Sequence, residues 1–510
     1  MTVTQTDLRQ APAPVASDER RSRNARRSTA GILVAAAAAC FFLVYPFVVP
    51  TSSLLVGFFV IFLMISLMLL KIPIAIAMTV ASFPGLYLLA GQRALEGSLQ
   101  EIAFSSFASW SLSVIPMFVL MGIVLGKSGL MSGAYDMARK WLGWMPGGLA
   151  VSTNIAGAGM AATSGSSIGN AYAIGRVAIP ELIKSGYRPS LTLGSVAMAG
   201  TLGQVIPPSV LLVIYAGVAE TPVGPQLLAG VVPGIALAVL FTVVILAWAM
   251  ISPDAAPRGA SYPLRERLAS LVNLIPMLII VSVVIGGIYV GVFTATEAGA
   301  CGAAVTVVLG LAALIVKARR ARANGEPVKT HRVLAKFLST SLIEATSAVA
   351  AVFLLLIGVN LLTRVMTLSG LAEWVADGVV GMNLTRLTFL LILIPVYLVL
   401  GFFLDTLGMM LLTIPVFIGP LVALDVNLIW FGVFLIVLAE IDLVAPPLGV
   451  LNFVVLALGQ ASTKGMGVKL TIGDVFKGVT PFIGACVVFL VALIVWPELA
   501  TWLPDVSSAK

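Results

Sequence analysis

The stretch "GTLGQVIPPSVLLVIYAG", residues 200–217, places two adjacent prolines in the middle of a long apolar run. A second stretch, "AEIDLVAPPLGVLNFVVLA", residues 439–457, repeats this arrangement. Proline has no backbone N–H, so each pair frees the carbonyls one turn earlier. The carbonyls concerned are those of Gly203, Gln204, Asp442 and Leu443. Because free carbonyls are costly in hydrocarbon unless something satisfies them, both stretches predict membrane helices that are broken at a binding site, where a cation could hold the carbonyls.

The composition around these stretches is that of a polytopic all-α membrane protein. Of 510 residues, 59% are hydrophobic and 10% are charged, against about 25% charged in a soluble domain. Apolar runs of about 18 residues, enough to cross the hydrocarbon, recur along the whole chain. We predict spans near residues 31–49, 52–70, 72–90, 112–126, 190–219, 227–251, 270–294, 296–316, 338–363, 428–458 and 480–503.

Two further apolar stretches, 147–180 and 387–424, are interrupted by Gly, Ser, Pro or Asp. Uninterrupted spans rarely carry such residues, whereas non-helical backbone is tolerated where it lines a site. Both stretches are therefore predicted to be re-entrant hairpins of two half-helices.

The net charge of +8 does not indicate nucleic-acid binding, because the basic residues lie in short loops between spans. With the start "RRSRNARR" in the cytoplasm, 26 of the 30 Lys and Arg fall on the inner side. The four outside are Arg93, Arg364, Arg386 and Lys510. His331 lies in a basic inner loop and is expected to be exposed. The prediction is a multi-pass protein of the cytoplasmic membrane with a cytoplasmic N-terminus.

Several features of the chain are predicted to have no chemical role. Cys40, Cys301 and Cys486 have unrelated spacings and read as inert core thiols. The start does not resemble a cleavable signal peptide. Residues 1–28 are polar and basic and are expected to be disordered, and residues 29–50 are expected to form an additional span.

The interrupted segments recur at a fixed offset. Pro207 and Pro446 are 239 residues apart, and the same offset carries Ser166 of "TSGSSIGN" onto Asp405 of "FLDTLGMM". On the predicted topology the two hairpins enter from opposite sides, so the units are inverted, which is typical of secondary transporters. The first repeat is expected at 51–256, with its hairpin at 147–180 and its broken helix at 190–219. Connecting spans and a basic loop follow at 257–336. The second repeat and the last span are expected at 337–510, with the hairpin at 387–424 and the broken helix at 428–458.

These segments offer oxygen ligands for Na⁺, a hard cation. The expected ion-binding residues lie at the hairpin tips and the helix breaks: Ser164, Gly165, Ser166, Ser167, Gly203, Pro207, Asp405, Thr406, Asp442 and Pro446. The half-helices after each Pro-Pro also favour an anion at their N-termini. Asn170, Ser209 and Gly449 are the predicted substrate contacts. Close helix packing by small residues and simple proline kinks are the alternatives, but recurrence at one offset favours a site.

Carboxylates at membrane depth are functional candidates. In this chain they are Asp405, Glu440, Asp442, Glu297 and Glu344. Glu297 and Glu344 lie near predicted span ends, which favours a structural role for them.

The run from "GGLAVSTNIAGAGMAATSGSS" through "RVAIPELIKSGYRPSLTLGSVAMAGTLGQVIPPSVLLVIYAG" to "LLAGVVPGI" resembles the large membrane subunit of tripartite ATP-independent periplasmic (TRAP) transporters. The second half, with "GFFLDTLGMMLLTIPVF" and "NLIWFGVFLIVLAEIDLVAPPLGVLNFVV", is similar too, so the resemblance covers about residues 52–503. It implies an elevator-type, sodium-coupled importer of small organic acids that is not an enzyme and needs no cofactor. It also implies a periplasmic binding protein and a small four-span membrane subunit, expected here as a separate chain.

The chain departs from the family pattern at three places. Ala445 stands where the family usually has Thr before the second Pro-Pro, and Asp442 stands where it usually has a small residue. The second ion site could therefore be rebuilt around a carboxylate or be coupled to H⁺. The span at 31–49 is additional. It either provides the extra crossing that a cytoplasmic N-terminus requires, because the family's large subunit is expected to begin on the outer side, or it anchors the chain in lipid.

Two alternatives remain open at this point. One is a binding-protein-independent sodium/carboxylate symporter, and another is a channel. An intramembrane enzyme is disfavoured because the chain has no HExxH or paired catalytic Asp motif. Importing a carboxylate against an inside-negative potential costs about 2.3 kcal/mol per charge per 100 mV. A dianion therefore needs more than two Na⁺, while two repeats supply at least two sites.

Overall fold

The computed structural model describes residues 16–130, 132–324, 329–401 and 404–508. Within these ranges the regular elements are all helical. In chain order they are α1 Ala16–Val48, α2 Ser53–Leu69, α3 Ile74–Ala108, η1 Ser111–Ser113, α4 Val114–Ser128, α5 Ser132–Leu142, α6 Gly148–Ser164, α7 Ser167–Lys184, α8 Pro189–Val205, α9 Val210–Val218, α10 Val223–Ala229, α11 Val231–Ile251, η2 Pro253–Ala255, α12 Leu264–Ser270, η3 Leu271–Leu274, α13 Ile275–Val281, η4 Ser282–Gly286, α14 Gly287–Val290, α15 Ala295–Ala323, α16 Thr330–Leu368, α17 Leu371–Gly381, α18 Arg386–Leu400, α19 Thr406–Ala423, α20 Leu428–Val444, α21 Val450–Ser462, α22 Ile472–Val495 and α23 Glu498–Ser508.

The lengths and apolar composition of these helices confirm the polytopic membrane class. Among the described residues, seven helices are long and apolar enough to cross a membrane, or nine if two bent pairs each form one span. Helices α2, α18 and α21 and the apolar part of α1 are apolar but shorter. The predicted span at 72–90 belongs to a longer helix, α3, which bends at Gly91, where φ is +80°.

The N-terminal region differs from the expectation of disorder over residues 1–28. Residues 16–28 belong to α1, which continues without interruption into the predicted additional span, whereas residues 1–15 lie outside the described part. Ring contacts hold α1 on α2: Phe42 stacks on Phe62 at 5.3 Å and Tyr45 contacts Phe59 at 5.4 Å. Aromatic packing between two neighbouring helices therefore attaches this segment to the bundle.

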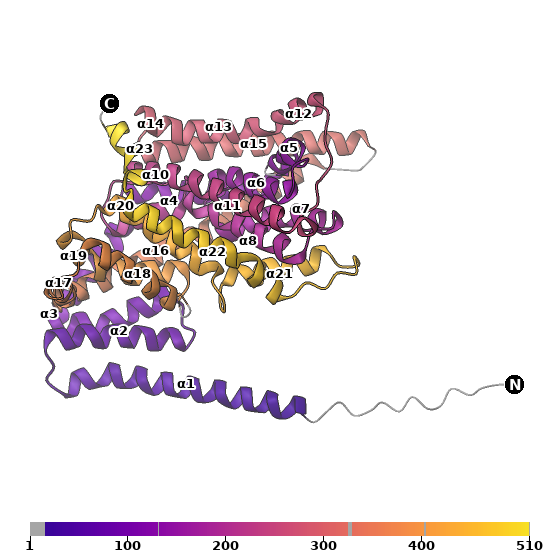
Figure 1. The fold of residues 1–510 in the computed structure, drawn as a ribbon. Helices are drawn as coiled ribbons and strands as arrows, with labels where there is room; N and C mark the ends of the chain where they lie inside the picture. Colours follow the sequence, from indigo (N-terminus) through magenta and orange to yellow (C-terminus); the bar gives the residue numbers. More distant parts are fainter. Residues whose placement is uncertain (1–15, 131, 325–328, 402–403, 509–510) are drawn as a thin grey trace.

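Helices α8 and α20 lie at the centre of the bundle and pack on each other. In each of them 14 of 17 residues are buried. Helices α1 and α2 lie along one edge of the molecule and α12–α15 along the opposite edge (Figure 1). Helices α8 and α20 each end one residue before a Pro-Pro pair. Pro207 and Pro208 are buried, whereas Pro446 and Pro447 are exposed, so only the first break lies in the interior of this chain.

Helix boundaries repeat at the offset found in the sequence. Helices α7 and α19 begin at residues 167 and 406, and α8 and α20 span 189–205 and 428–444, so each pair is displaced by 239 residues. The two halves also share a Ser-Gly-Leu sequence, at 128–130 and at 369–371, and the short helices α5 and α17 begin at or just after it. The two halves of the chain thus form the same succession of elements.

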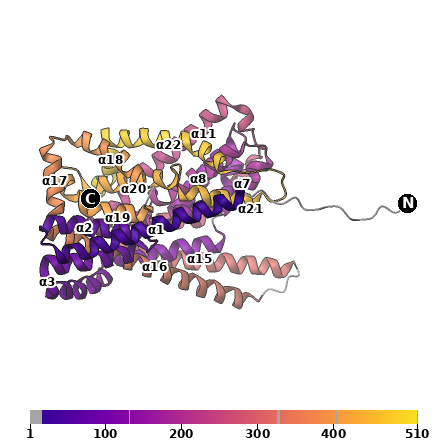
Figure 2. The same cartoon turned by 90° about the horizontal axis from the view of Figure 1, so that it is seen from below.

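The basic segments gather at one end of the molecule. Figures 1 and 2 both place the start of α1, the end of α15, the start of α16, and helix α7 at this end. His331, which opens α16, is exposed there, as expected.

Candidate functional site

The first hairpin tip joins α6 to α7 at Gly165 and Ser166. Gly165 ends α6 with φ +61°, and Ser166 caps α7 by accepting a hydrogen bond from the Gly169 N–H at 3.3 Å. A Cβ atom at Gly165 would lie 3.0 Å from the Pro208 carbonyl oxygen, and one at Gly203 would lie 2.7 Å from the Ser166 carbonyl oxygen. Glycine at these two positions therefore allows the tip to rest directly on the break between α8 and α9.

The second hairpin consists of α18 and α19. Phe389 contacts Phe417 edge-on, and the Tyr397 hydroxyl bonds to Thr413, so the two helices run antiparallel. Asp405 is the N-cap residue of α19. Just before the tip, Gly401 leaves space that Asp442 fills: a Cβ at Gly401 would lie 1.7 Å from the Asp442 carboxylate carbon. Asp442 therefore lies directly against the start of the second tip.

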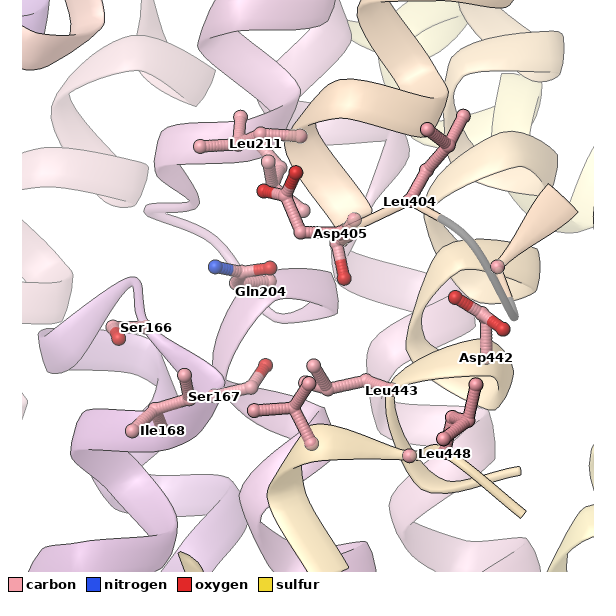
Figure 3. A pocket seen from close by; sticks show the side chains of 15 residues that line it. Ser166, Ser167, Ile168, Gln204, Leu211, Leu404, Asp405, Asp442, Leu443 and Leu448 are labelled. Carbon is pink, nitrogen blue, oxygen red and sulfur yellow. The ribbon is translucent and has the colours of Figure 1, made fainter. Parts of the chain in front are cut away.

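The two tips and the helix ends at the two breaks line an open cavity of about 180 Å³, in which Asp405 is exposed. Figure 3 shows Ser166 and Ser167 on one side of it and Asp442 on the other, with Asp405 and Gln204 between them. The lining residues are Ser166, Ser167, Ile168, Gln204, Leu211, Gly401, Leu404, Asp405, Thr406, Leu407, Asp442, Leu443, Leu448, Gly449 and Val450. Tertiary structure thus brings together elements that lie more than 200 residues apart in the chain.

The cavity is chemically acidic and rich in oxygen. Two carboxylates, Asp405 and Asp442, line it, and among its described lining residues there is no Lys, Arg or His. Thr406 Oγ1 and Asp442 Oδ1 are buried atoms without a hydrogen-bond partner in the described structure. Buried polar atoms normally have partners, so these oxygens have the capacity to hold a cation. Among the described residues there is no group of three or more His, Cys, Asp or Glu that could hold a metal ion.

Glu440 links the two halves beside the cavity. The Ser167 hydroxyl donates a hydrogen bond of 2.7 Å to Glu440 Oε2, and Glu440 is 3% exposed. Because this bond uses the proton of Ser167, the lone pairs of its oxygen remain available on the cavity side. Glu440 is therefore a positioning residue for the first tip.

The sequence suggested that a cation holds the four carbonyls freed by the Pro-Pro pairs. The structure differs, because protein groups bond two of them. Ser209 donates its hydroxyl to the Gln204 carbonyl at 2.5 Å, and the Ala445 N–H reaches the Asp442 carbonyl at 3.1 Å. Protein donors thus satisfy two of the four. The oxygens without a hydrogen-bond partner belong to side chains: Thr406 at the second tip and Asp442 in α20. Neither Pro207 nor Pro446 lines the cavity.

Two of the three predicted substrate contacts form hydrogen bonds within the protein and do not line this cavity. Asn170 is fully buried and donates to the carbonyls of Gly157 and Ala199, at 3.0 and 2.9 Å. Ser209 is fully buried and caps α9. Only Gly449 lines the cavity. Proximity in sequence to the tips did not reveal that Asn170 links α7 to α6 and α8, or that Ser209 bonds the backbone at the first break.

The other carboxylate candidates lie outside this cavity. Glu297 forms a capping box with Thr294 at the start of α15. Glu344 pairs with Lys127 at 2.5 Å. Both have structural roles, as the sequence predicted.

Gln204 and Gly401 are lining residues that the sequence did not identify as such. Gln204 is a polar side chain in a buried helix three residues before Pro207, which is a usable signal. The importance of Gly401 becomes visible only through its contact with Asp442, 41 residues later. Ser164 and Gly165, which were predicted, line a second and larger cavity on the other side of the first tip.

Paired hairpins and broken helices around an acidic cavity define a membrane transporter fold. Solved structures agree: the chain is similar to the YdaH transporter of Alcanivorax borkumensis, with TM-score 0.55, 15% identity and coverage of 80% of this chain and 90% of that one. It is also similar to MtrF of Neisseria gonorrhoeae, with TM-score 0.53, 11% identity and coverage of 85% and 94%. At these identities the likeness concerns the fold alone.

The family is shown by sequence. Residues 61–499 match the family model for the DctM component of the tripartite ATP-independent periplasmic transporter, so the chain belongs to that family. It is 30% identical over 451 residues to the C4-dicarboxylate TRAP transporter large permease protein of Vibrio cholerae serotype O1, covering 87% of this chain and 96% of that one. The corresponding protein of Pseudomonas aeruginosa is 32% identical over 409 residues, covering 80% and 89%.

Family membership confirms the resemblance seen in the motifs. The chain is the large permease subunit of a bacterial transporter that also contains a small permease and a periplasmic binding protein, and its relatives are permeases rather than enzymes.

Proposed function

We propose that this subunit imports small organic acids together with Na⁺, and that the acidic cavity between the hairpin tips holds the coupling ion. Asp405 and Asp442 supply negative charge, and the hydroxyls of Ser166, Ser167 and Thr406 supply further oxygens. In this proposal the basic end of the molecule faces the cytoplasm.

The observation that carries the proposal is the pair of carboxylates in one cavity without a basic side chain among its described lining residues. A carboxylate at membrane depth needs a proton or a cation. Na⁺ takes carboxylate, hydroxyl and carbonyl oxygens, which are the groups present here. A cavity of about 180 Å³ far exceeds the roughly 10–15 Å³ that one water requires.

The substrate class rests on the named relatives. Some of them are named as C4-dicarboxylate permeases, and others are named for sialic acid, ectoine and isethionate. C4-dicarboxylates, sialic acid and ectoine contain carboxylate groups and isethionate contains a sulfonate, which supports a small organic acid as substrate.

An elevator movement of the hairpins is part of the proposal. Support comes from the repeated helix boundaries and from the packing of the first hairpin on α4, through α6, and of the second on α16, through α19. The tip of the first hairpin passes close to α4, because a Cβ at Gly122 would lie 2.4 Å from the Ser164 carbonyl oxygen. A small residue at this contact permits sliding of one helix past the other.

Coupling to H⁺ is a second candidate, and Asp442 is the observation that favours it. This carboxylate is 6% exposed and one of its oxygens lacks a partner in the described structure. With Asp442→Asn, uptake measured against Na⁺ and against pH distinguishes the two: a lost pH dependence indicates H⁺, and unchanged dependence on both ions removes Asp442 from coupling.

The sodium site can be tested without knowing the substrate. Purified protein is heated in NaCl or in KCl at equal ionic strength, since a ligand that binds the folded state raises the unfolding midpoint by mass action. We expect Na⁺ alone to raise the midpoint, and Asp405→Asn to abolish this increase. Glu373→Gln, which removes an exposed carboxylate on α17, should retain it. An Asp405→Asn protein still stabilised by Na⁺ would remove the second tip from the ion site.

A further inference from the structure

A second cavity of about 800 Å³ lies on the other side of the first hairpin tip, between α4, α7 and α16. Ser166 and Gln204 line both cavities, so the two spaces meet at the tip. The larger cavity extends along α7 to Tyr172 and Arg176. Because Arg176 follows Ser166 by ten residues, it lies about 15 Å further along α7, a helix that Figures 1 and 2 place at the basic end of the molecule.

The two cations of this cavity differ in their partners. Lys127 is paired with Glu344 at 2.5 Å. The Arg176 guanidinium lies 5.8 Å from the centre of the Tyr172 ring, and within the described parts of the chain no carboxylate lies within ion-pair distance of it. Arg176 is exposed and has no ion-pair partner among the described residues, so its guanidinium can meet a ligand at the wall of this cavity.

The arrangement suits a carboxylate ligand. A guanidinium presents parallel N–H donors that match the two oxygens of a carboxylate. The Tyr172 ring, one turn before Arg176, supports the guanidinium face and leaves its edge free. Other lining groups are mostly small or apolar, such as Gly126, Gly169 and Val177, so charge recognition in this cavity falls to Arg176.

We propose that Arg176, supported by Tyr172, binds a carboxylate group of the substrate in the larger cavity, between the hairpin tip and the basic end of the protein. This rests on the proposed function, that the subunit carries organic acids, and assigns a particular residue to their recognition. The volume of about 800 Å³ falls within the range of small-molecule sites.

Protection from an arginine reagent tests the contact directly. The purified chain with its small permease subunit, in lipid nanodiscs, is treated with phenylglyoxal, and modification of each arginine is followed by peptide mass spectrometry. The probes are succinate, lactate and the uncharged succinamide. We expect succinate or lactate to slow modification of Arg176 at least threefold and succinamide to leave it unchanged. Arg188, an exposed residue outside both cavities, should react at the same rate throughout.

Matched variants separate charge from position. Arg176→Gln should raise the succinate or lactate concentration needed for half-maximal thermal stabilisation about tenfold, a change of about 1.4 kcal/mol. Lys184→Gln removes the same charge from an exposed position of α7 outside the cavity and should have no effect. Arg176→Lys should give an intermediate value because it retains the charge but not the paired donors.

The outcomes distinguish this inference from the proposed function. Stabilisation by Na⁺ together with equal Arg176 modification in all three probes would overturn the role of Arg176 while leaving the sodium site intact. Equal loss of affinity in Arg176→Gln and Lys184→Gln would also overturn it, because the effect would then be general surface charge. Loss of Na⁺ stabilisation with Arg176 still protected by a carboxylate would contradict the proposed coupling instead.

Discussion

The tips of the two hairpins occupy matching positions in the chain but present different groups to the cavity between them. At the first tip, Ser166 and Ser167 offer hydroxyls, and at the second, Asp405 and Thr406 offer a carboxylate and a hydroxyl. The helices behind them match too: Gly203 in α8 corresponds to Asp442 in α20 at the same offset of 239 residues. One half is thus neutral at its tip and break, and the other carries two acids.

This difference shows that two halves with the same succession of helices can have different roles at the cavity, one in close packing and the other in supplying charge. In the first half, Gly203 lets the backbone of the tip approach the broken helix. In the second half, the space is provided by Gly401, and the Asp442 side chain fills it. Close backbone packing therefore stabilises one tip, whereas the other supplies the charge that a cation requires.

Converting the second tip to the chemistry of the first should have the largest effect. In Asp405→Ser, the carboxylate is replaced by the residue type found at Ser166. We expect Na⁺-driven uptake into proteoliposomes containing the complete transporter to fall about 100-fold, because interactions with a charged group are worth about 1.5–3 kcal/mol each. Ser166→Ala should lower it only about tenfold. Equal effects of both changes would show that the two tips contribute alike.

The matching positions in the broken helices should respond in opposite ways. Gly203→Ala places a Cβ 2.7 Å from the Ser166 carbonyl oxygen, and such overpacking costs about 1–3 kcal/mol of folding free energy. Asp442→Gly creates no clash and should change ion dependence more than stability. Thermal unfolding in detergent measures the first effect and ion-dependent uptake the second. A Gly203→Ala protein as stable as the wild type would contradict the close contact.

A smaller contrast is expected between two hydroxyl residues. Ser167→Ala removes the donor to Glu440 Oε2 and leaves a buried acceptor without a partner, which costs about 1–3 kcal/mol. Thr406→Val removes a hydroxyl whose oxygen has no partner in the described structure. It should leave stability in KCl nearly unchanged while reducing stabilisation by Na⁺. Comparable destabilisation of both variants in KCl would argue that Thr406 has a structural partner.

The smallest effect is expected where the two Ser-Gly-Leu sequences differ. Lys127→Leu converts "KSGL" into "LSGL", as found at Leu368. It removes the ion pair between Lys127 and Glu344, whose side chains are 31% and 58% exposed, respectively. Exposed ion pairs contribute about 0–1 kcal/mol, so the unfolding midpoint should shift only slightly. A large decrease would mean that Lys127 has a further role in holding α4 against α16.

Sequence patterns predicted the frame of the molecule more fully than its contacts. The offset of 239 residues, the two interrupted hairpins and the two Pro-Pro breaks are all visible in the chain, because glycine, proline and charge are conspicuous in apolar sequence. The roles of Asn170 and Ser209 could not be predicted from the sequence. Their side chains bond backbone carbonyls, and which carbonyls come within reach depends on how the chain packs.

What the amino-acid sequence determined by itself is the class of protein and the places where its helices break. Apolar runs must be helical in hydrocarbon, and Pro-Pro pairs prevent continuous hydrogen bonding wherever they occur. Tertiary structure alone decided that Asp405 and Asp442 share a cavity with Ser166, that Asp442 lies against Gly401, and that Glu440 holds Ser167. These contacts join residues from opposite halves of the chain or from separate helices, so they depend on the packing of the helices rather than on local sequence.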